Sequence, residues 1–143
     1  HIAKMDMDAY LDVRDFLGAA AGFATDCPNV YGGRPWTCDR AAFCPPQRCG
    51  HKYSNHYFKY SNFTQGCWSY MQGGFYFMTP KLALEVSRSD GWWATEEGKC
   101  FPEDAIAGKA IYMWARESPG GSQRCVSIMS LQGEGAEAVW HNP

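Results

Sequence analysis

The chain has 143 residues, of which 45% are hydrophobic and 20% charged, and its net charge is −2. This composition is that of one globular domain and excludes a disordered chain. No two Lys or Arg residues are adjacent, and no apolar run approaches the roughly 18 residues of a membrane span. We therefore expect neither a nucleic-acid partner nor a membrane span in this stretch.

The first part of the chain predicts a strand, a helix and a second strand. Residues 3–8 predict a strand that runs into an acidic turn. Residues 11–24 have the apolar spacing of a helix, with Asp12 and Asp15 near its start. Residues 29–36 predict a short strand that a pair of glycines interrupts.

The middle of the chain is rich in cysteine and then in aromatic residues. Residues 37–50 contain three cysteines and two adjacent prolines with little periodicity, and we predict a cysteine-rich insertion loop there. Residues 52–63 alternate aromatic and polar residues, which favours one or two short strands.

The last part predicts two helices and a strand. Thr79 and Pro80 are typical of a helix start, and we expect this helix to reach about Ser89. A second helix begins at residues 102–104, and residues 124–129 predict a strand. No repeat or linker is evident, so residues 1–143 are predicted to form a single α/β unit.

The seven cysteines indicate an oxidising compartment and a disulfide framework. Because seven is odd, at least one thiol is unpaired or pairs outside this stretch. We predict that most are paired and that the loop at residues 37–50 is stapled to the body of the domain. The sequon at residues 62–64 agrees with a secretory route, although so short a pattern also arises by chance. An alternative is a zinc module made by Cys38, Cys44, Cys49 and His51, whose spacing is not a common zinc pattern.

Two segments have the residue types of a metal and sugar site. Asp6 and Asp8 follow an apolar strand with one residue between them, a spacing that can hold a divalent cation and through it a diphosphate; the alternative is two surface acids. Gly73 and Gly74 stand between aromatic residues, which could let a backbone approach a ligand above a sugar-binding floor. The alternative there is a glycine-rich turn between two core strands.

Two further features are acids at a helix start and a late histidine. Glu103 and Asp104 fall in the first turn of a predicted helix, where the helix dipole favours ionised carboxylates. Taken alone, the pair is better explained by ordinary charge preference at helix starts. His141, taken alone, has the character of a surface residue.

Taken in order, these segments resemble the β-1,3-galactosyltransferase and Fringe family, including the core-one galactosyltransferases. The family carries K-x-D-D-D-x-F, Y-x-x-G-G-x-Y-x-x-S, E-D-x-x-x-G and a late histidine. This chain has KMDMDAY, YMQGGFYFMT, EDAIAG and WHNP in that order, and Cys100 also matches a family cysteine. The resemblance spans nearly the whole chain. It implies the C-terminal part of a GT-A-type mixed sheet flanked by helices, with the cysteine-rich loop as an insertion.

The resemblance implies an inverting hexosyltransferase that moves a sugar from a UDP-sugar to a glycan or glycoprotein hydroxyl with the help of Mn²⁺. It implies a Golgi-lumen or extracellular location, or another oxidising lumen. The implied roles are metal ligands at Asp8 and His141, a donor-facing carboxylate at Asp6, a donor and acceptor cleft at Gly73, Gly74, Tyr76 and Glu103, and a general base at Asp104.

The sequence departs from the family pattern in three ways. Met7 replaces the middle Asp, Thr79 replaces Ser, and the strands that hold uracil and ribose in the family are missing from this stretch. We therefore expect another polypeptide segment to cover the edge near residues 2–5, and we expect the 143-residue chain alone not to transfer sugar. The alternative is a non-catalytic domain that acts as a structural or interaction subunit of a larger assembly.

Overall fold

The computed structural model describes residues 1–36, 70–96, 102–117, 124–131 and 138–141. Its elements are β1 (Ile2–Met5), β2 (Ala9–Leu11), α1 (Val13–Gly22), β3 (Val30–Trp36), β4 (Tyr70–Met78), α2 (Pro80–Val86), α3 (Trp92–Thr95), α4 (Glu103–Arg116), β5 (Ser127–Ser130) and β6 (Val139–His141). None of the helices within these ranges is long and apolar enough to cross a membrane.

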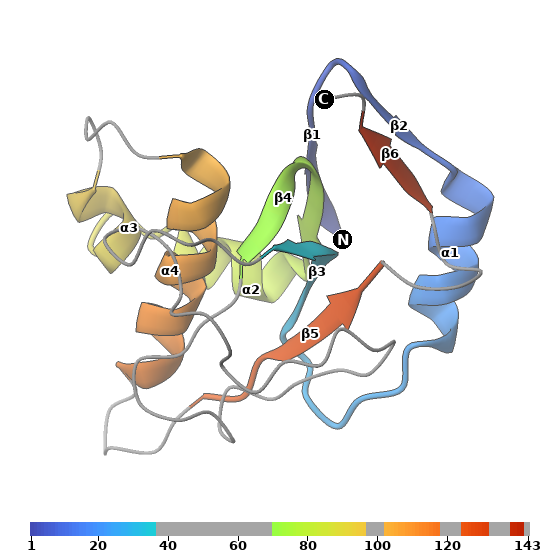
Figure 1. The fold of residues 1–143 in the computed structure, drawn as a ribbon. Coiled ribbons are helices and arrows are strands. Elements are labelled where there is room, and N and C mark those ends of the chain that lie inside the picture. The colour runs from blue at the N-terminus through green and yellow to red at the C-terminus, as the bar shows by residue number, and fades with distance from the viewer. Residues whose placement is uncertain (37–69, 97–101, 118–123, 132–137, 142–143) are drawn as a thin grey trace.

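Four strands form a mixed sheet in the order β1-β4-β3-β5. Strand β4 runs antiparallel to both β1 and β3, whereas β3 and β5 are parallel. Strands β2 and β6 form a separate antiparallel pair. Figure 1 shows α1 on one side of the sheet and α2, α3 and α4 on the other. This arrangement confirms the prediction of a mixed sheet that is flanked by helices.

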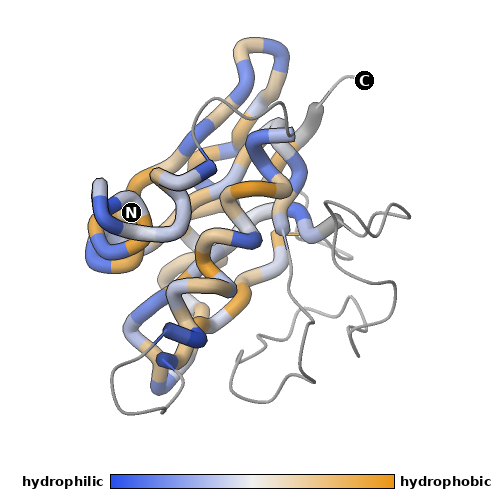
Figure 2. The backbone as a smooth tube through the Cα atoms, turned by 90° about the vertical axis from the view of Figure 1, so that its left-hand side faces the viewer, coloured by the Kyte–Doolittle hydropathy of each residue, from blue (hydrophilic) through white to orange (hydrophobic). Residues whose placement is uncertain are grey.

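Alternate residues of β4 build the two hydrophobic cores, one on each face of the sheet. Tyr76 and Met78 belong to the core that α2 and α4 cover. Phe75 and Phe77 belong to the other core, where the ring of Phe16 from α1 lies 5.4 Å and 5.1 Å from their respective centroids. In Figure 2, hydrophilic and hydrophobic residues are mixed along the backbone of the described elements. This pattern is expected of helices and strands that bury one face.

The paired glycines of β3 do not interrupt the strand, so that prediction is wrong. A Cβ atom at Gly32 would lie 2.3 Å from Cζ of Phe77, which is fully buried. Glycine therefore leaves room for an aromatic ring from the neighbouring strand instead of ending the strand. The register shifts only between Gly33 and Pro35. The alternative of a turn at Gly73 is also wrong, because β4 continues through it.

The predicted helices are present with small differences. Asp12 caps α1 by accepting hydrogen bonds from the backbone N–H groups of Arg14 and Asp15 at 2.9 Å and 3.1 Å. Thr79 precedes α2 as predicted, but its hydroxyl accepts from the N–H of Val30 at 3.2 Å and does not cap the helix. Helix α2 ends at Val86, earlier than expected.

Further elements were missed or lie outside the description. Helix α4 begins at Glu103 as predicted, whereas β2, α3 and β6 were not predicted. The loop predicted at residues 37–50 and the strands predicted at residues 52–63 lie outside the described residues.

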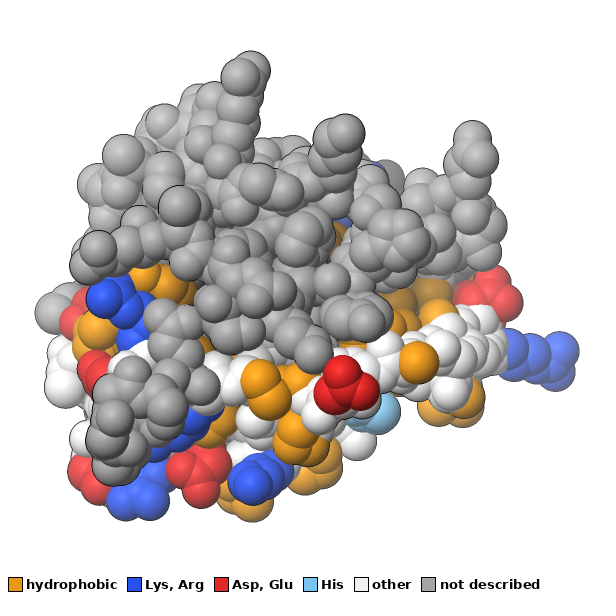
Figure 3. All heavy atoms as spheres, turned by 90° about the horizontal axis from the view of Figure 1, so that it is seen from below, with side chains coloured by type: hydrophobic (Ala, Val, Ile, Leu, Met, Phe, Trp, Pro, Cys, Tyr) orange, Lys and Arg blue, Asp and Glu red, His pale blue; other side chains and the backbone are white. Residues whose placement is uncertain are grey.

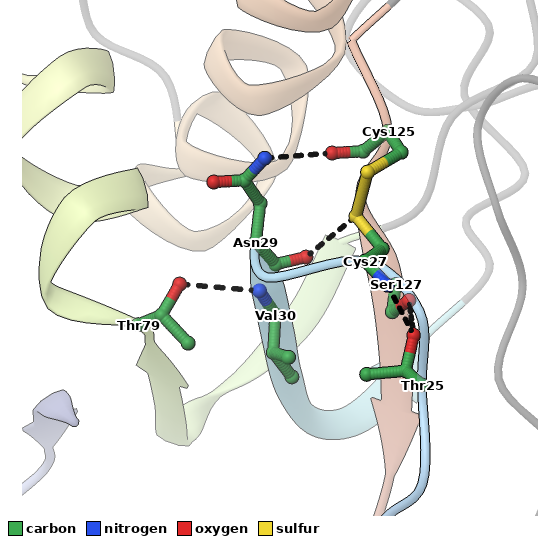
Figure 4. The surroundings of a disulfide bond; sticks show 7 residues. All are labelled: Thr25, Cys27, Asn29, Val30, Thr79, Cys125 and Ser127. Atoms are coloured by element: carbon green, nitrogen blue, oxygen red, sulfur yellow. Dashed lines mark hydrogen bonds between the residues drawn. A yellow bond between two sulfur atoms is a disulfide. The ribbon is translucent and has the colours of Figure 1, made fainter.

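A disulfide joins Cys27 to Cys125 and confirms one part of the predicted framework (Figure 4). The two cysteines precede the parallel strands β3 and β5. Beside them the Ser127 N–H donates to the carbonyl of Asn29 at 2.8 Å, and the Asn29 amide donates to the carbonyl of Cys125 at 3.0 Å. The bond therefore fixes the ends of two paired strands. The other cysteines, the zinc alternative and the sequon lie outside the described residues.

Candidate functional site

The candidate site forms where three elements meet: the end of β1, the middle of β4 and the first turn of α4. The backbone N–H of Asp6 donates to the carbonyl of Gly74 at 3.0 Å. The N–H of Gly73 donates to Oδ2 of Asp104 at 3.1 Å. Three of the predicted motifs, which are distant in the sequence, are thus in direct contact.

Three carboxylates surround the position where a side chain at Gly73 would begin. A Cβ atom there would lie 3.5 Å from Oδ2 of Asp6, 3.6 Å from Oδ2 of Asp104 and 3.6 Å from Oε1 of Glu103. These are ordinary van der Waals distances, so the three carboxylates converge on one point beside the β4 backbone.

The ammonium of Lys4 contacts two of these three carboxylates. Its ammonium pairs with the carboxylate of Asp6, donates to Oε1 of Glu103 at 2.7 Å and donates to the carbonyl of Gly73 at 2.8 Å. Burial lowers the pKa of Lys4, but the hydrogen bonds to Asp6 and Glu103 outweigh it, and the net effect raises the pKa. Lys4 therefore stays positively charged and holds the end of β1 against α4.

Glu103 is also bound from its other side. The hydroxyl of Tyr76 donates to Oε2 of Glu103 at 2.8 Å, so both carboxylate oxygens have partners. Burial, together with this hydrogen bond, raises the pKa of Tyr76 far above its usual range. Tyr76 therefore remains a neutral hydroxyl donor at any physiological pH.

Asp104 is the carboxylate best suited to take up a proton. It is partly buried, and burial raises its pKa above the ordinary value, with a smaller contribution from the charge of Glu103. Backbone hydrogen bonds from Ala105, at 2.7 Å to Oδ1, and from Gly73 oppose this shift but do not cancel it. A carboxylate with a raised pKa accepts a proton more readily near neutral pH than an ordinary Asp does.

The predicted site residues divide into two groups. Those brought together are Asp6, Gly73, Gly74, Tyr76, Glu103 and Asp104. Asp8 lies instead in the exposed turn between β1 and β2. Strand pairing places the backbone of His141 opposite Ala9, next along the chain from Asp8, while the side chain of His141 is outside the description.

The metal site at Asp8 and His141 therefore stays a prediction. Among the side chains that the structure describes, no group of three or more His, Cys, Asp or Glu is arranged to hold a metal ion. The backbone register relates His141 only to Ala9, the residue after Asp8.

Lys4 is the site residue that sequence reasoning missed. Its contact with Asp6 could have been predicted, because Lys4 stands two residues before Asp6 in the sequence. Residues two apart at the end of a strand tend to share a face. Its contact with Glu103 was not open to prediction, because it depends on how β1 and α4 meet across β4.

The raised pKa of Asp104 can be tested without any substrate. We expect the carboxyl carbon of Asp104, assigned by its loss in Asp104→Asn, to titrate in carbon NMR above the ordinary Asp value of about 3.9. Glu103→Gln removes a neighbouring negative charge and should lower the midpoint. The pKa of the Asp104 carboxyl is higher in the folded protein than in the unfolded chain. The stability that this group contributes to the fold is therefore fully present below its unfolded pKa, and it is lost as the pH rises through its folded pKa. A midpoint at or below the ordinary value contradicts this account.

Comparison of the chain with protein-family models, with curated proteins and with solved structures found no match. The fold defines the class as a mixed α/β protein with a four-stranded mixed sheet, helices on both faces and one disulfide among the described residues. Any narrower function rests on the residues of the site.

Proposed function

We propose that this chain is the metal and acceptor part of an inverting, UDP-sugar-dependent glycosyltransferase. The observation that carries the proposal is the contact among Lys4, Gly73 and Asp104, which are separated by 69 and 31 residues in the sequence. Three motifs that were matched only by their order in the chain thus share one site.

In the proposed reaction an acceptor hydroxyl attacks the anomeric carbon of the donor sugar. The new carbon–oxygen bond forms as the bond from that carbon to the diphosphate breaks, and UDP leaves with the bonding electrons. Asp104 takes the hydroxyl proton, because burial raises its pKa, whereas Glu103 is held in an ion pair with Lys4. One displacement without a covalent intermediate inverts the anomeric carbon.

The charge of the site supports a cation requirement. One ammonium, Lys4, stands among the carboxylates of Asp6, Glu103 and Asp104, so the group is net negative when all are ionised. An anionic diphosphate is repelled by such a group unless another cation is present. Asp8 and His141 would hold this ion, and a bound Mn²⁺ would neutralise the charge that develops on the departing UDP.

The proposal includes a setting and partners. A glycan or glycoprotein would be the acceptor, and another polypeptide segment would cover the outer edge of β1. The disulfide between Cys27 and Cys125 agrees with an oxidising compartment, and we propose the Golgi lumen or the extracellular space. On the face shown in Figure 3, described side chains of both charge signs are interspersed with apolar ones. Such a surface does not favour a nucleic-acid partner.

A second candidate is a non-catalytic domain of the same kind that acts as an interaction subunit. Met7, which stands where the family has its middle Asp, is fully exposed at 106% of its reference area. An exposed thioether between two acids gives no oxygen ligand and is suited to contact with another protein. This candidate predicts no nucleotide binding.

Calorimetric titration of UDP, with and without Mn²⁺, into the longest native form of the protein separates the two candidates. We expect Mn²⁺ to tighten UDP binding about tenfold or more, a change of about 1.4 kcal/mol. Asp8→Asn should remove this gain, and Asp15→Asn, an exposed acid on α1, should keep it. Absence of UDP binding under both conditions would overturn the enzymatic proposal in favour of the interaction subunit.

A further inference from the structure

Lys4 contacts one acceptor from each of the three elements that form the candidate site. Its ammonium pairs with the carboxylate of Asp6 after β1, donates to the carbonyl of Gly73 in β4 at 2.8 Å and donates to Oε1 of Glu103 in α4 at 2.7 Å. An ammonium has three N–H donors and no acceptor, so these contacts use all three donors. The position of Lys4 is therefore fixed by protein groups.

The backbone of Gly73 is the first link between Lys4 and Asp104. The carbonyl of Gly73 accepts from Lys4, and the N–H of the same residue donates to Oδ2 of Asp104 at 3.1 Å. Both groups of one strand residue point to the same side of the strand. A hydrogen bond to a carboxylate favours its charged form, so a movement of the Gly73 backbone would change the proton affinity of Asp104.

The carboxylate of Glu103 is the second link. Burial is the main reason that the pKa of Asp104 is raised, and the negative charge of Glu103, its neighbour in the first turn of α4, adds to this effect. Lys4 pairs with Oε1 of Glu103, while Tyr76 donates to Oε2. The Lys4 ammonium also lies 5.9 Å from the centroid of the Tyr76 ring. The carboxylate of Glu103 therefore has both a fixed position and a counter-charge.

We propose that Lys4 is a positioning residue that acts on Asp104 indirectly, by holding in place the backbone and the carboxylate that link the two. The inference rests on the proposed function, because that function gives Asp104 its task as the base. It adds that the ammonium of Lys4 controls when this base loses its proton.

Among the described side chains, Asp6 and Tyr76 are the other ionisable groups of the site. Oδ2 of Asp6 and Oδ2 of Asp104 lie 3.5 Å and 3.6 Å from the position that a Cβ atom of Gly73 would take, and the charge of Asp6 is also paired with Lys4. Tyr76 is a neutral donor, because burial raises its pKa far above its usual range. Loss of the Lys4 charge therefore leaves only negative charges facing Asp104 in this part of the site, which favours the protonated form of Asp104.

Lys4→Met tests the proposal in the folded protein without any substrate. We expect the midpoint of the Asp104 carboxyl carbon in carbon NMR to rise by about half a pH unit or more, because Glu103 keeps its charge and loses its counter-ion. Lys4→Arg keeps the charge and should stay close to the original midpoint. Lys4→Gln keeps N–H donors without the charge, and it replaces the Met variant if that variant does not fold. Lys81→Met, at an exposed lysine of α2, is the matched control and should leave the midpoint unchanged.

The double variant Lys4→Met/Glu103→Gln separates an indirect effect from a direct one. When residue 103 is neutral, loss of Lys4 should shift the Asp104 midpoint less than about half as far as it does beside a charged Glu103. An equal shift in both backgrounds would show that Lys4 acts on Asp104 directly through its charge. An unchanged midpoint in both Lys4→Met and Lys4→Gln would show that Lys4 only stabilises the fold. Either result overturns the proposal.

The pH–rate profile of an active form keeps this result separate from the proposed function. Because a base is active only when it is deprotonated, the acidic limb of the profile should move to higher pH together with the NMR midpoint in Lys4→Met. If the midpoint moves and the profile does not, Asp104 is not the base and the proposed mechanism fails, while the action of Lys4 on Asp104 stands. If neither moves, the inference about Lys4 is wrong and the proposed function is unaffected.

Discussion

Asp104→Asn should lower turnover by roughly 10²-fold or more in an active full-length form, while the affinity for UDP changes little. Asn keeps the shape of the side chain but cannot accept the acceptor proton. The effect should appear in the rate of transfer and not in nucleotide binding, because in the proposed arrangement the donor diphosphate is held through the cation at Asp8 and His141 and not by Asp104. Initial rates with UDP-sugar and acceptor, together with UDP calorimetry, measure both quantities.

The substitution also has a structural cost that must be separated from catalysis. Both oxygens of Asp104 accept backbone hydrogen bonds, from Gly73 and from Ala105. An Asn side chain can accept through its oxygen, but its amide nitrogen would face the other N–H group. We expect the free energy of unfolding to fall by about 1–3 kcal/mol. Rates should therefore be compared well below the melting temperature of the variant.

Asp90→Asn is a suitable control for the loss of a carboxylate. Asp90 is exposed and pairs with Arg88, at 2.8 Å, in the segment between α2 and α3. It lies outside the contacts of the candidate site, so this variant should keep both turnover and UDP binding. Unchanged turnover in Asp104→Asn would remove Asp104 from the mechanism, whatever the control shows.

Local signals in the sequence were sufficient to predict the individual segments of the site. They were not sufficient to predict that these segments contact one another in the fold. The start of α4 at Glu103 and the acidic turn after β1 follow from residue types that are adjacent in the chain. That Glu103 and Lys4 meet across β4 depends on the strand order, in which β4 lies between β1 and β3. No spacing within a single segment encodes that order.

The misprediction at Gly32 has the same origin. A pair of glycines is locally a signal for a break, yet the space above Gly32 is filled by the Phe77 ring from β4. The reason for glycine is thus found in another strand. The pairing of β2 with β6 was hidden for a related reason, because three residues are too few to show a strand period and the partners come from opposite ends of the chain.

The second large effect is expected from removal of the disulfide. The double variant Cys27→Ala/Cys125→Ala should lose about 4–5 kcal/mol of unfolding free energy, because the bond closes a loop between residues that are 98 apart. A domain has a total of only about 5–15 kcal/mol, so the loss is between about a third and nearly all of the stability. Urea unfolding followed by circular dichroism measures it.

The position of the bond in the sheet explains why other contacts should not compensate. Strand β5 has only β3 as a neighbour in the described sheet, and the disulfide precedes both strands. The backbone bond from Ser127 to Asn29 and the pair of hydroxyls of Thr25 and Ser127 support the same end, but each is worth only about 1 kcal/mol. Thr25→Val keeps the disulfide but removes a hydroxyl that contacts Ser127 and accepts from the N–H of Cys27, so it should cost about 1–2 kcal/mol, which makes it the matched control. If the double variant unfolds at the same urea concentration as the oxidised protein, contacts other than Cys27–Cys125 hold β5 in place and the assignment of stability to this bond is wrong.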